Sequence, residues 1–116
     1  MFPEDASSPI PNVNVIDINK VKKGGGSDLY LVIASPLPAE TEPLERLMQK
    51  LETYLAFIGS EQFRSASGLA SPENTRIIVK LHPNSDPKAR ELLERNAGWV
   101  RNNGATLVID SDLSSA

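Results

Sequence analysis

Hydrophobic residues between positions 41 and 59 recur at spacings of three and four, the period of one buried helical face. Pro43 near the start and Gly59 at the end suit the two termini of a helix. The pattern predicts an amphipathic helix of about sixteen residues, on the order of 24 Å long. Its apolar stripe comprises Leu44, Leu47, Met48, Leu51, Tyr54, Leu55 and Ile58. Such a stripe indicates packing against a core rather than chemistry.

Four further segments carry the pattern of β-strands. Residues 13–21 alternate loosely, as an edge strand does, whereas residues 29–34 are continuously apolar, as in a central strand covered on both faces. Residues 75–81 alternate strictly, and residues 106–109 form a short last strand. Three consecutive glycines between the first two strands predict a hairpin turn. A strand follows these glycines instead of a helix, so they do not predict a phosphate-binding loop.

The remaining segments predict a loop and a second helix. Residues 60–74 are small and polar and predict an unusually long loop, with Phe63 and Leu69 as anchors onto the core. Asp86 is a good N-cap and is followed by proline, so a helix is expected over residues 87–103.

The predicted order of elements is therefore ββαβαβ. The first connection is a hairpin, and the two later connections each carry a helix, which predicts one antiparallel pair followed by right-handed parallel crossovers. We expect an α/β fold of the α+β two-layer sandwich type, with a four-stranded mixed sheet and two helices on one face. Residues 1–12 and 111–116 are expected to be flexible tails around a single globular domain of residues 13–110.

The far face of such a sheet lacks a cover. Apolar residues of the central strands are expected to project there, and an exposed apolar patch of this size usually has a partner. The sequence therefore predicts a homodimer that forms through this face. The residues predicted to lie on it are Tyr30, Val32, Ala34, Ile78 and Val108.

Composition and charge remove several classes of function. The chain has no cysteine, which excludes disulfides, thiolate catalysis and thiolate metal sites. The formal net charge is −3, and no basic stripe with interleaved aromatic residues is present, which argues against binding to nucleic acid. No apolar run approaches the ~20 residues of a membrane span, and the first residues do not resemble a secretory signal. We expect a cytoplasmic protein with no nucleic-acid or membrane partner.

One group of polar residues could carry chemistry. If the last two strands are parallel neighbours, their C-terminal ends bring His82, Asp86, Asp110 and Asp112 to one edge of the sheet, where ligand sites are common. An imidazole with carboxylates can bind a divalent metal or act as acid and base. Structural roles explain the same residues: Asp86 as a helix cap, His82 as a strand-end residue, and the other two as solvated acids.

No motif identifies a catalytic residue, a metal or a cofactor, and a single histidine cannot fill several catalytic roles. The sequence therefore favours a non-enzymatic interaction module. The alternative is a small-ligand-binding or metal-binding protein, or an enzyme, that uses a strand-end site around His82 and Asp110. Tyr54 is interpreted as a core tyrosine whose hydroxyl reaches the rim, and Trp99 as a packing residue. Gln49 and Lys50 are assigned to the solvated face of the first helix.

Two segments resemble a known family. Residues 12–17 read Asn-Val-Asn-Val-Ile-Asp, and residues 48–58 read Met-Gln-Lys-Leu-Glu-Thr-Tyr-Leu-Ala-Phe-Ile. With the strand, helix and strand that follow, they resemble a family of small bacterial proteins described only as a domain of unknown function, over roughly residues 12–110. That family has Asn at the position of Thr53 and a sequence nearer Glu-Ser-Gly after Ile58, where this chain has Gly-Ser-Glu. The resemblance implies a shared fold and supplies no catalytic residues.

Overall fold

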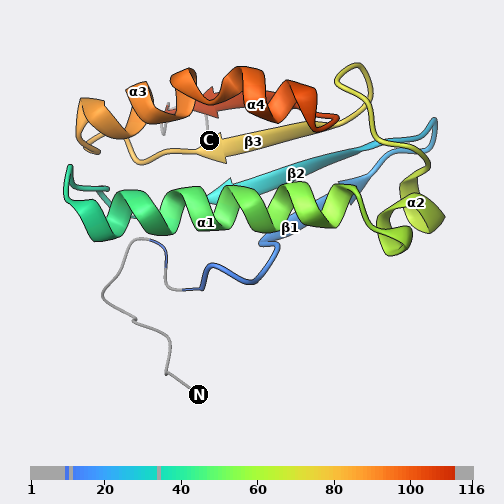
Figure 1. Cartoon of the computed structure of the whole chain (residues 1–116), viewed down its shortest axis with the longest axis horizontal. Coiled ribbons are helices and arrows are strands. Elements are labelled where there is room, and N and C mark those ends of the chain that lie inside the picture. Colours follow the sequence, from blue (N-terminus) through green and yellow to red (C-terminus); the bar gives the residue numbers. More distant parts are fainter. Residues whose placement is uncertain (1–9, 11, 34, 112–116) are drawn as a thin grey trace.

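The computed structural model describes residues 10, 12–33 and 35–111 of the 116-residue chain (Figure 1). The four strands in this part form one sheet in the order β1-β2-β3-β4. Strand β1 is antiparallel to β2, and the pairs β2–β3 and β3–β4 are parallel. The predicted four-stranded mixed sheet is therefore confirmed, and the fold is α+β. The elements are β1 (Ile18–Val21), β2 (Ser27–Val32), α1 (Thr41–Ile58), α2 (Glu61–Ser67), β3 (Arg76–Lys80), α3 (Pro87–Arg95), α4 (Ala97–Asn102) and β4 (Thr106–Asp110).

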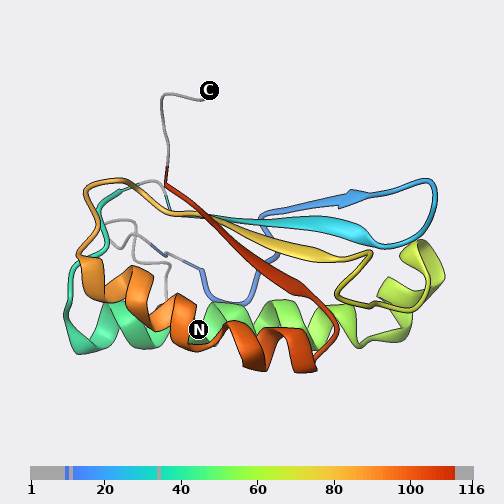
Figure 2. The same ribbon diagram turned by 90° about the horizontal axis from the view of Figure 1, so that it is seen from above.

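The helices lie along one side of the sheet, and the side chains of the strands divide accordingly (Figure 2). Leu29 and Leu31 of β2 and Ile77 and Val79 of β3 point toward the helices and are fully buried. Alternate residues of the same strands point to the opposite face, because successive side chains of a strand project to opposite sides. The helices contribute fully buried residues to the same core, among them Leu47, Leu51, Tyr54, Phe63, Leu93 and Val100.

Helix α1 matches the predicted amphipathic helix in extent and facing. Its buried hydrophobic residues are Leu47, Leu51, Tyr54, Leu55 and Ile58, and Leu44 and Met48 pack against the core while partly exposed. The prediction for one polar residue is wrong. Lys50 is only 3% exposed and does not lie on a solvated face.

The segment predicted as a long loop contains helix α2. Ser60 caps this helix, since its Oγ accepts a hydrogen bond from the backbone N–H of Phe63 at 3.2 Å. Phe63 is fully buried and meets Phe57 edge to face, with ring centroids 5.5 Å apart. Leu69 is 72% exposed. The predicted anchor at Phe63 is therefore confirmed, and the one at Leu69 is wrong.

The second predicted helix is divided into α3 and α4 at Asn96. The Asn96 side chain donates a hydrogen bond to the carbonyl of Leu92 at 2.8 Å, a local bond with which asparagine competes against a continuous helix. Asp86 caps α3 as predicted, because its Oδ1 accepts the backbone N–H of Lys88 at 2.9 Å. With α2 and α4 included, the observed order is ββααβααβ and not the predicted ββαβαβ.

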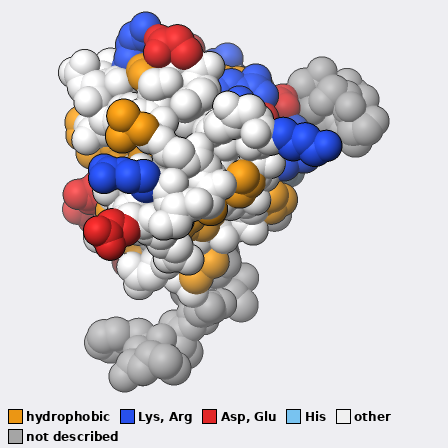
Figure 3. Space-filling model, turned by 90° about the vertical axis from the view of Figure 1, so that its right-hand side faces the viewer, with side chains coloured by type: hydrophobic (Ala, Val, Ile, Leu, Met, Phe, Trp, Pro, Cys, Tyr) orange, Lys and Arg blue, Asp and Glu red, His pale blue; other side chains and the backbone are white. Residues whose placement is uncertain are grey.

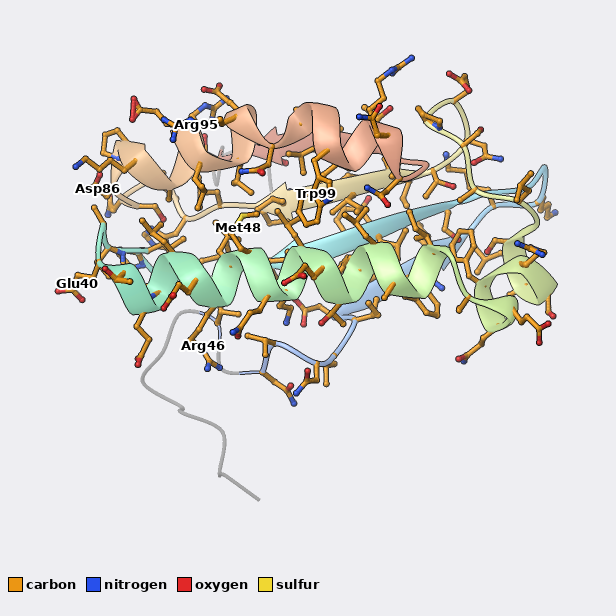
Figure 4. All side chains as sticks on the ribbon, viewed as in Figure 1. Glu40, Arg46, Met48, Asp86, Arg95 and Trp99 are labelled. Atoms are coloured by element: carbon orange, nitrogen blue, oxygen red, sulfur yellow. The ribbon has the colours of Figure 1, made fainter. Side chains whose placement is uncertain are left out.

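Strand β1 is shorter than the predicted strand of residues 13–21, because it begins at Ile18. The carboxylate of Asp17 accepts the backbone N–H of Val32 at 2.9 Å, so a side chain takes the place of the expected backbone pairing. Upstream of β1 the chain runs beside α1, and Ile10 is 1% exposed. Arg46, on that edge of α1, donates to the carbonyl of Ile10 at 2.8 Å (Figure 4). The predictions for residues 1–9, 11, 34 and 112–116 lie outside the described residues.

The hairpin turn between β1 and β2 packs against the chain around α2. The backbone N–H of Gly26 donates to the carbonyl of Ser67 at 2.6 Å. The φ angle of Gly26 is +81°, and a Cβ there would lie 2.0 Å from the backbone oxygen of Asn74. Glycine is therefore required for this contact. On the surface of this end of the molecule, charged residues of both signs and hydrophobic residues are interspersed (Figure 3).

Candidate functional site

The strand-end group predicted from sequence is only partly assembled. The backbone N–H of Leu81 donates to the carbonyl of Asp110 at 2.8 Å, so the ends of β3 and β4 do lie side by side. His82, next along the chain, uses Nδ1 to accept the backbone N–H of Asn84 at 3.1 Å. This bond closes the turn that leads to α3.

The carboxylates of this group have structural partners. Asp86 caps α3, and its own N–H donates to the carbonyl of Leu37 at 2.8 Å. Asp110 Oδ2 lies 2.6 Å from the ammonium nitrogen of Lys80. Asp112 lies outside the described residues. Within the described ranges, no group of three or more His, Cys, Asp or Glu residues is arranged to hold a metal ion.

A second polar group, which the sequence did not predict, joins α1 to the segment before β1. The ammonium nitrogen of Lys50 lies 2.7 Å from Asp17 Oδ1 and donates to the carbonyl of Asn12 at 2.9 Å. The Lys50 side chain is 4% exposed and that of Asp17 is 23% exposed. The lysine charge is thus nearly removed from water and is compensated by one carboxylate. Buried charges require such pairing.

Tyr54 completes this group. Its hydroxyl donates to the carbonyl of Tyr30 at 2.6 Å and accepts the backbone N–H of Asp17 at 2.9 Å. Burial raises the pKa of the Tyr54 hydroxyl, so the phenol stays neutral and can keep donating. The side chains of Asp17, Lys50 and Tyr54 are each held by contacts within the chain. The group therefore fastens the segment before β1, and β2, to α1.

The two segments that carry the family resemblance meet in this group. Asn12 and Asp17 belong to the first segment, and Lys50 and Tyr54 belong to the second. Four residues of the two motifs thus take part in a contact that holds the fold together.

The face of the sheet opposite the helices carries a central apolar row. Strand register aligns one residue from each strand across this face. Ile18 at the β1 edge is 51% exposed, and Ile78 in the middle is 7% exposed because its neighbours flank it. Val32, which lies two residues after Tyr30 on the same face of β2, is 40% exposed. The row runs in the order Ile18, Tyr30, Ile78 and Val108.

Ion pairs border this row on both sides. On one side, Asp28 of β2 and Arg76 of β3 are register partners, and two bonds of 2.7 and 3.0 Å join them. On the other side, Lys80 of β3 pairs with Asp110 of β4 at 2.6 Å. The open face is thus an apolar stripe between two rows of paired charges. Of the predicted face residues, Tyr30, Val32, Ile78 and Val108 lie on this side, and Ala34 is outside the described residues.

The Asp28 carboxylate is held in its charged form. Its hydrogen bonds with Arg76 lower the pKa of Asp28 below the ordinary value, burial opposes this, and Lys22 at 3.2 Å assists it. The same bonds raise the pKa of Arg76. The Arg76 side chain is 47% exposed, so solvent moderates the strength of this pair.

The substitution Asp28→Asn is expected to lower the free energy of unfolding by about 1 kcal/mol at neutral pH, the upper end for a solvent-moderated pair. A carboxyl with a lowered pKa in the folded state stabilises the protein above its unfolded pKa, and this contribution is lost as pH falls through the folded pKa. The difference in the free energy of unfolding between wild type and variant should therefore become smaller as the pH is lowered. Urea unfolding of both proteins across acidic pH measures it. A difference that stays constant with pH would contradict the assignment.

A shallow hollow of about 520 Å³ lies on the helical side, between α1 and α3. Met48 of α1 and Trp99 of α4 project into the space between the helices (Figure 4). The hollow is largely open to solvent, unlike the enclosed clefts in which small-molecule ligands are usually buried. Its lining residues are Thr41, Leu44, Glu45, Met48, Gln49, Glu52 and Leu92.

Comparison of the chain with known protein families, with curated proteins and with solved structures finds no match. Within the part of the chain that the structure describes, none of the helices is both long enough and apolar enough to span a bilayer.

Proposed function

We propose that this protein is a non-enzymatic interaction module that forms a homodimer through the open face of its sheet. The observation that carries the proposal is the apolar row of Ile18, Tyr30, Ile78 and Val108 on the side opposite the helices. Without a partner, Ile18 at the edge of this row is 51% exposed and Val32 beside the row is 40% exposed, whereas Ile78 is already covered by its neighbours. Apolar rows on uncovered sheet faces commonly mark interaction sites.

The size of this face sets the expected strength of association. Four strands spaced about 4.8 Å apart, with five residues rising about 3.3 Å each, span a face of about 19 by 17 Å. Stable interfaces of standard size bury about 800 Å² on each partner, which is more than this face provides. The proposed dimer is therefore weak, with a dissociation constant in the micromolar range.

The strand-end alternative receives less support. His82 and Asp86 are engaged in turn and cap bonds, and Asp110 is paired with Lys80. The family that the sequence resembles consists of small bacterial proteins, and this proposal retains that setting, a cytoplasmic location and the absence of a nucleic-acid partner.

Sedimentation velocity over a concentration series up to high micromolar tests the proposal. The expected result is a reversible shift from monomer to dimer as concentration rises. A protein that stays monomeric at the highest concentration would remove self-association as its function.

The surface involved is tested by the substitution Val32→Lys. Val32 is already 40% exposed on the open face, so a lysine there perturbs the surface more than the core. Placing a charge in a desolvated interface is expected to weaken the dimer at least tenfold. Leu69→Lys is the matched control, because Leu69 is a 72% exposed apolar residue outside the sheet. Equal dimerisation by the two variants would assign the contact to another surface, such as the hollow between α1 and α3.

A further inference from the structure

We infer that the two copies are related by a two-fold axis that runs parallel to the strands, between β2 and β3. This inference rests on the proposed function, since it specifies the geometry of the same face. The sheet order β1-β2-β3-β4 has its centre between β2 and β3, so an axis there gives the largest overlap of two identical faces. Such an interface is isologous, meaning that each contact occurs twice with the roles of the copies exchanged.

The strand register fixes which residues would meet. An axis in this position places β2 of one copy over β3 of the other, and β1 over β4. In the apolar row, Tyr30 then faces Ile78 of the partner subunit, and Ile18 faces Val108 of the partner subunit. Apolar residues therefore meet apolar residues along the whole row, as the core of an interface requires.

The charges provide the stronger argument. In the row beside the apolar one, Asp28 and Arg76 occupy equivalent positions on the two sides of the axis. The axis places Asp28 over Arg76 of the partner subunit, and Arg76 over Asp28 of the partner subunit. The two ion pairs therefore stack head to tail, so that each charge has opposite charges as its nearest neighbours. Electrostatic complementarity of this kind selects one orientation among several that bury similar area.

The other aligned packing is disfavoured by the same charges. Two sheets can also stack with the axis perpendicular to the strands, which places each strand over its own copy, running in the opposite direction. The row that contains Arg76 then faces the row of the other copy that contains Lys80. Arg76 would then lie over Lys80 of the partner subunit, and Lys80 over Arg76 of the partner subunit. Like charges brought together in an interface cost several kcal/mol. The axis parallel to the strands avoids this repulsion.

A charge exchange tests the geometry. The double substitution Asp28→Arg with Arg76→Asp keeps an ion pair within each chain and reverses its direction. In a dimer of two exchanged chains, each arginine again faces an aspartate of the other copy, so this variant should dimerise within about threefold of wild type. A mixed dimer of exchanged and wild-type chains would place arginine over arginine and aspartate over aspartate. Mixed dimers should therefore be at least tenfold less abundant than random pairing gives.

The measurement is native mass spectrometry of the two proteins mixed at high micromolar concentration, with one of them labelled with ¹⁵N. Wild type mixed with its own labelled form gives the random proportion of mixed dimers. Circular dichroism and thermal melting establish that the exchanged variant folds. Random mixing of exchanged and wild-type chains, with both forming dimers, would overturn the parallel axis while leaving dimerisation intact.

A complementary experiment uses the single substitutions Asp28→Lys and Arg76→Glu. Each alone places like charges across the proposed interface and should weaken self-association at least tenfold. Mixing the two restores opposite charges across the interface, although the pair within each chain stays broken. Dimers that form in the mixture and not in the separate proteins support the inference, since recovery can come only from contacts between chains. Dimers absent from the mixture, in proteins that fold and in a wild type that dimerises, would reject it. A wild-type protein that never dimerises would contradict the proposed function instead.

Discussion

Replacing Asp17 with alanine is expected to lower the free energy of unfolding by about 3–5 kcal/mol, the cost of leaving one member of a buried ion pair without its partner. Lys50 would keep its bond to the carbonyl of Asn12 and lose the carboxylate that lies 2.7 Å from its ammonium nitrogen. Since domains of this size unfold at a total cost of about 5–15 kcal/mol, the loss is a large part of the stability. Urea unfolding followed by circular dichroism measures it.

The two partners should not respond equally. The Asp17 side chain is 23% exposed, so in a Lys50→Met variant the remaining carboxylate can be hydrated and can still accept the N–H of Val32. Lys50→Met should therefore cost less than Asp17→Ala. Methionine also fills the space of the lysine stem without a charge. The double variant Asp17→Ala with Lys50→Met should be more stable than Asp17→Ala alone, because it no longer buries an ammonium group without a carboxylate partner.

An exposed ion pair serves as a matched control, because it shows how much stability is lost when a pair is broken without burial of its charges. Arg90 and Glu94 form an ion pair at 3.4 Å on α3 in which both side chains are about half exposed. The substitution Glu94→Gln should change stability by only about 0.5 kcal/mol, as surface pairs typically do. A loss for Asp17→Ala as small as this, or a double variant less stable than Asp17→Ala, would show that Lys50 is not held as a buried charge.

Patterns within single elements predicted much of the fold. The stripe of α1 was correct because one long helix against one sheet gives a clear period of three and four. The hairpin and the two parallel pairs followed from the kind of connection, since a tight turn joins antiparallel strands and a segment that carries a helix joins parallel ones. Helix α2 was missed because a helix of seven residues is too short to display a period, and only Ser60 and Phe63 mark it.

Contacts between distant segments could not be predicted in the same way. Lys50 was assigned to the solvated face, off the apolar stripe, although it follows Leu47 by three residues and precedes Tyr54 by four. Its spacing thus placed it on the buried stripe. What the sequence could not supply was the partner, because Asp17 lies 33 positions away. The hydrogen bond from the backbone N–H of Val32 to the Asp17 carboxylate, which lies just before the start of β1, could not be predicted for the same reason.

The same difference between single segments and contacts between segments applies to the open face of the sheet. Because successive side chains of a strand point to opposite faces, Tyr30, Val32 and Ile78 lie on the side opposite the helices. The ion pairs that border them depend on the register between strands, which no single segment encodes. Asp28 and Arg76 therefore emerged as a candidate interface pair only from the structure.

Replacing Phe63 with alanine is expected to destabilise the protein by about 3–5 kcal/mol, the range for truncating a fully buried aromatic residue. Phe63 is 0% exposed and contacts Phe57 of α1 edge to face. Removing the ring leaves a cavity between α2 and the end of α1. The carbonyl of Ser67, which binds Gly26 of the hairpin, would lose the support of that packing. Chemical unfolding at neutral pH measures the total loss.

Leu69→Ala is the control for this substitution. Leu69 lies six positions later and was an equally reasonable anchor by sequence, yet it is 72% exposed, so its truncation should change stability by less than about 0.5 kcal/mol. Hydrogen exchange adds a local measure, because Phe63→Ala should increase exchange at the Gly26 amide and Leu69→Ala should not. Similar small losses for both variants would mean that α2 does not pack on the core. A larger loss of stability for Leu69→Ala than for Phe63→Ala would instead support the predicted loop anchored at Leu69.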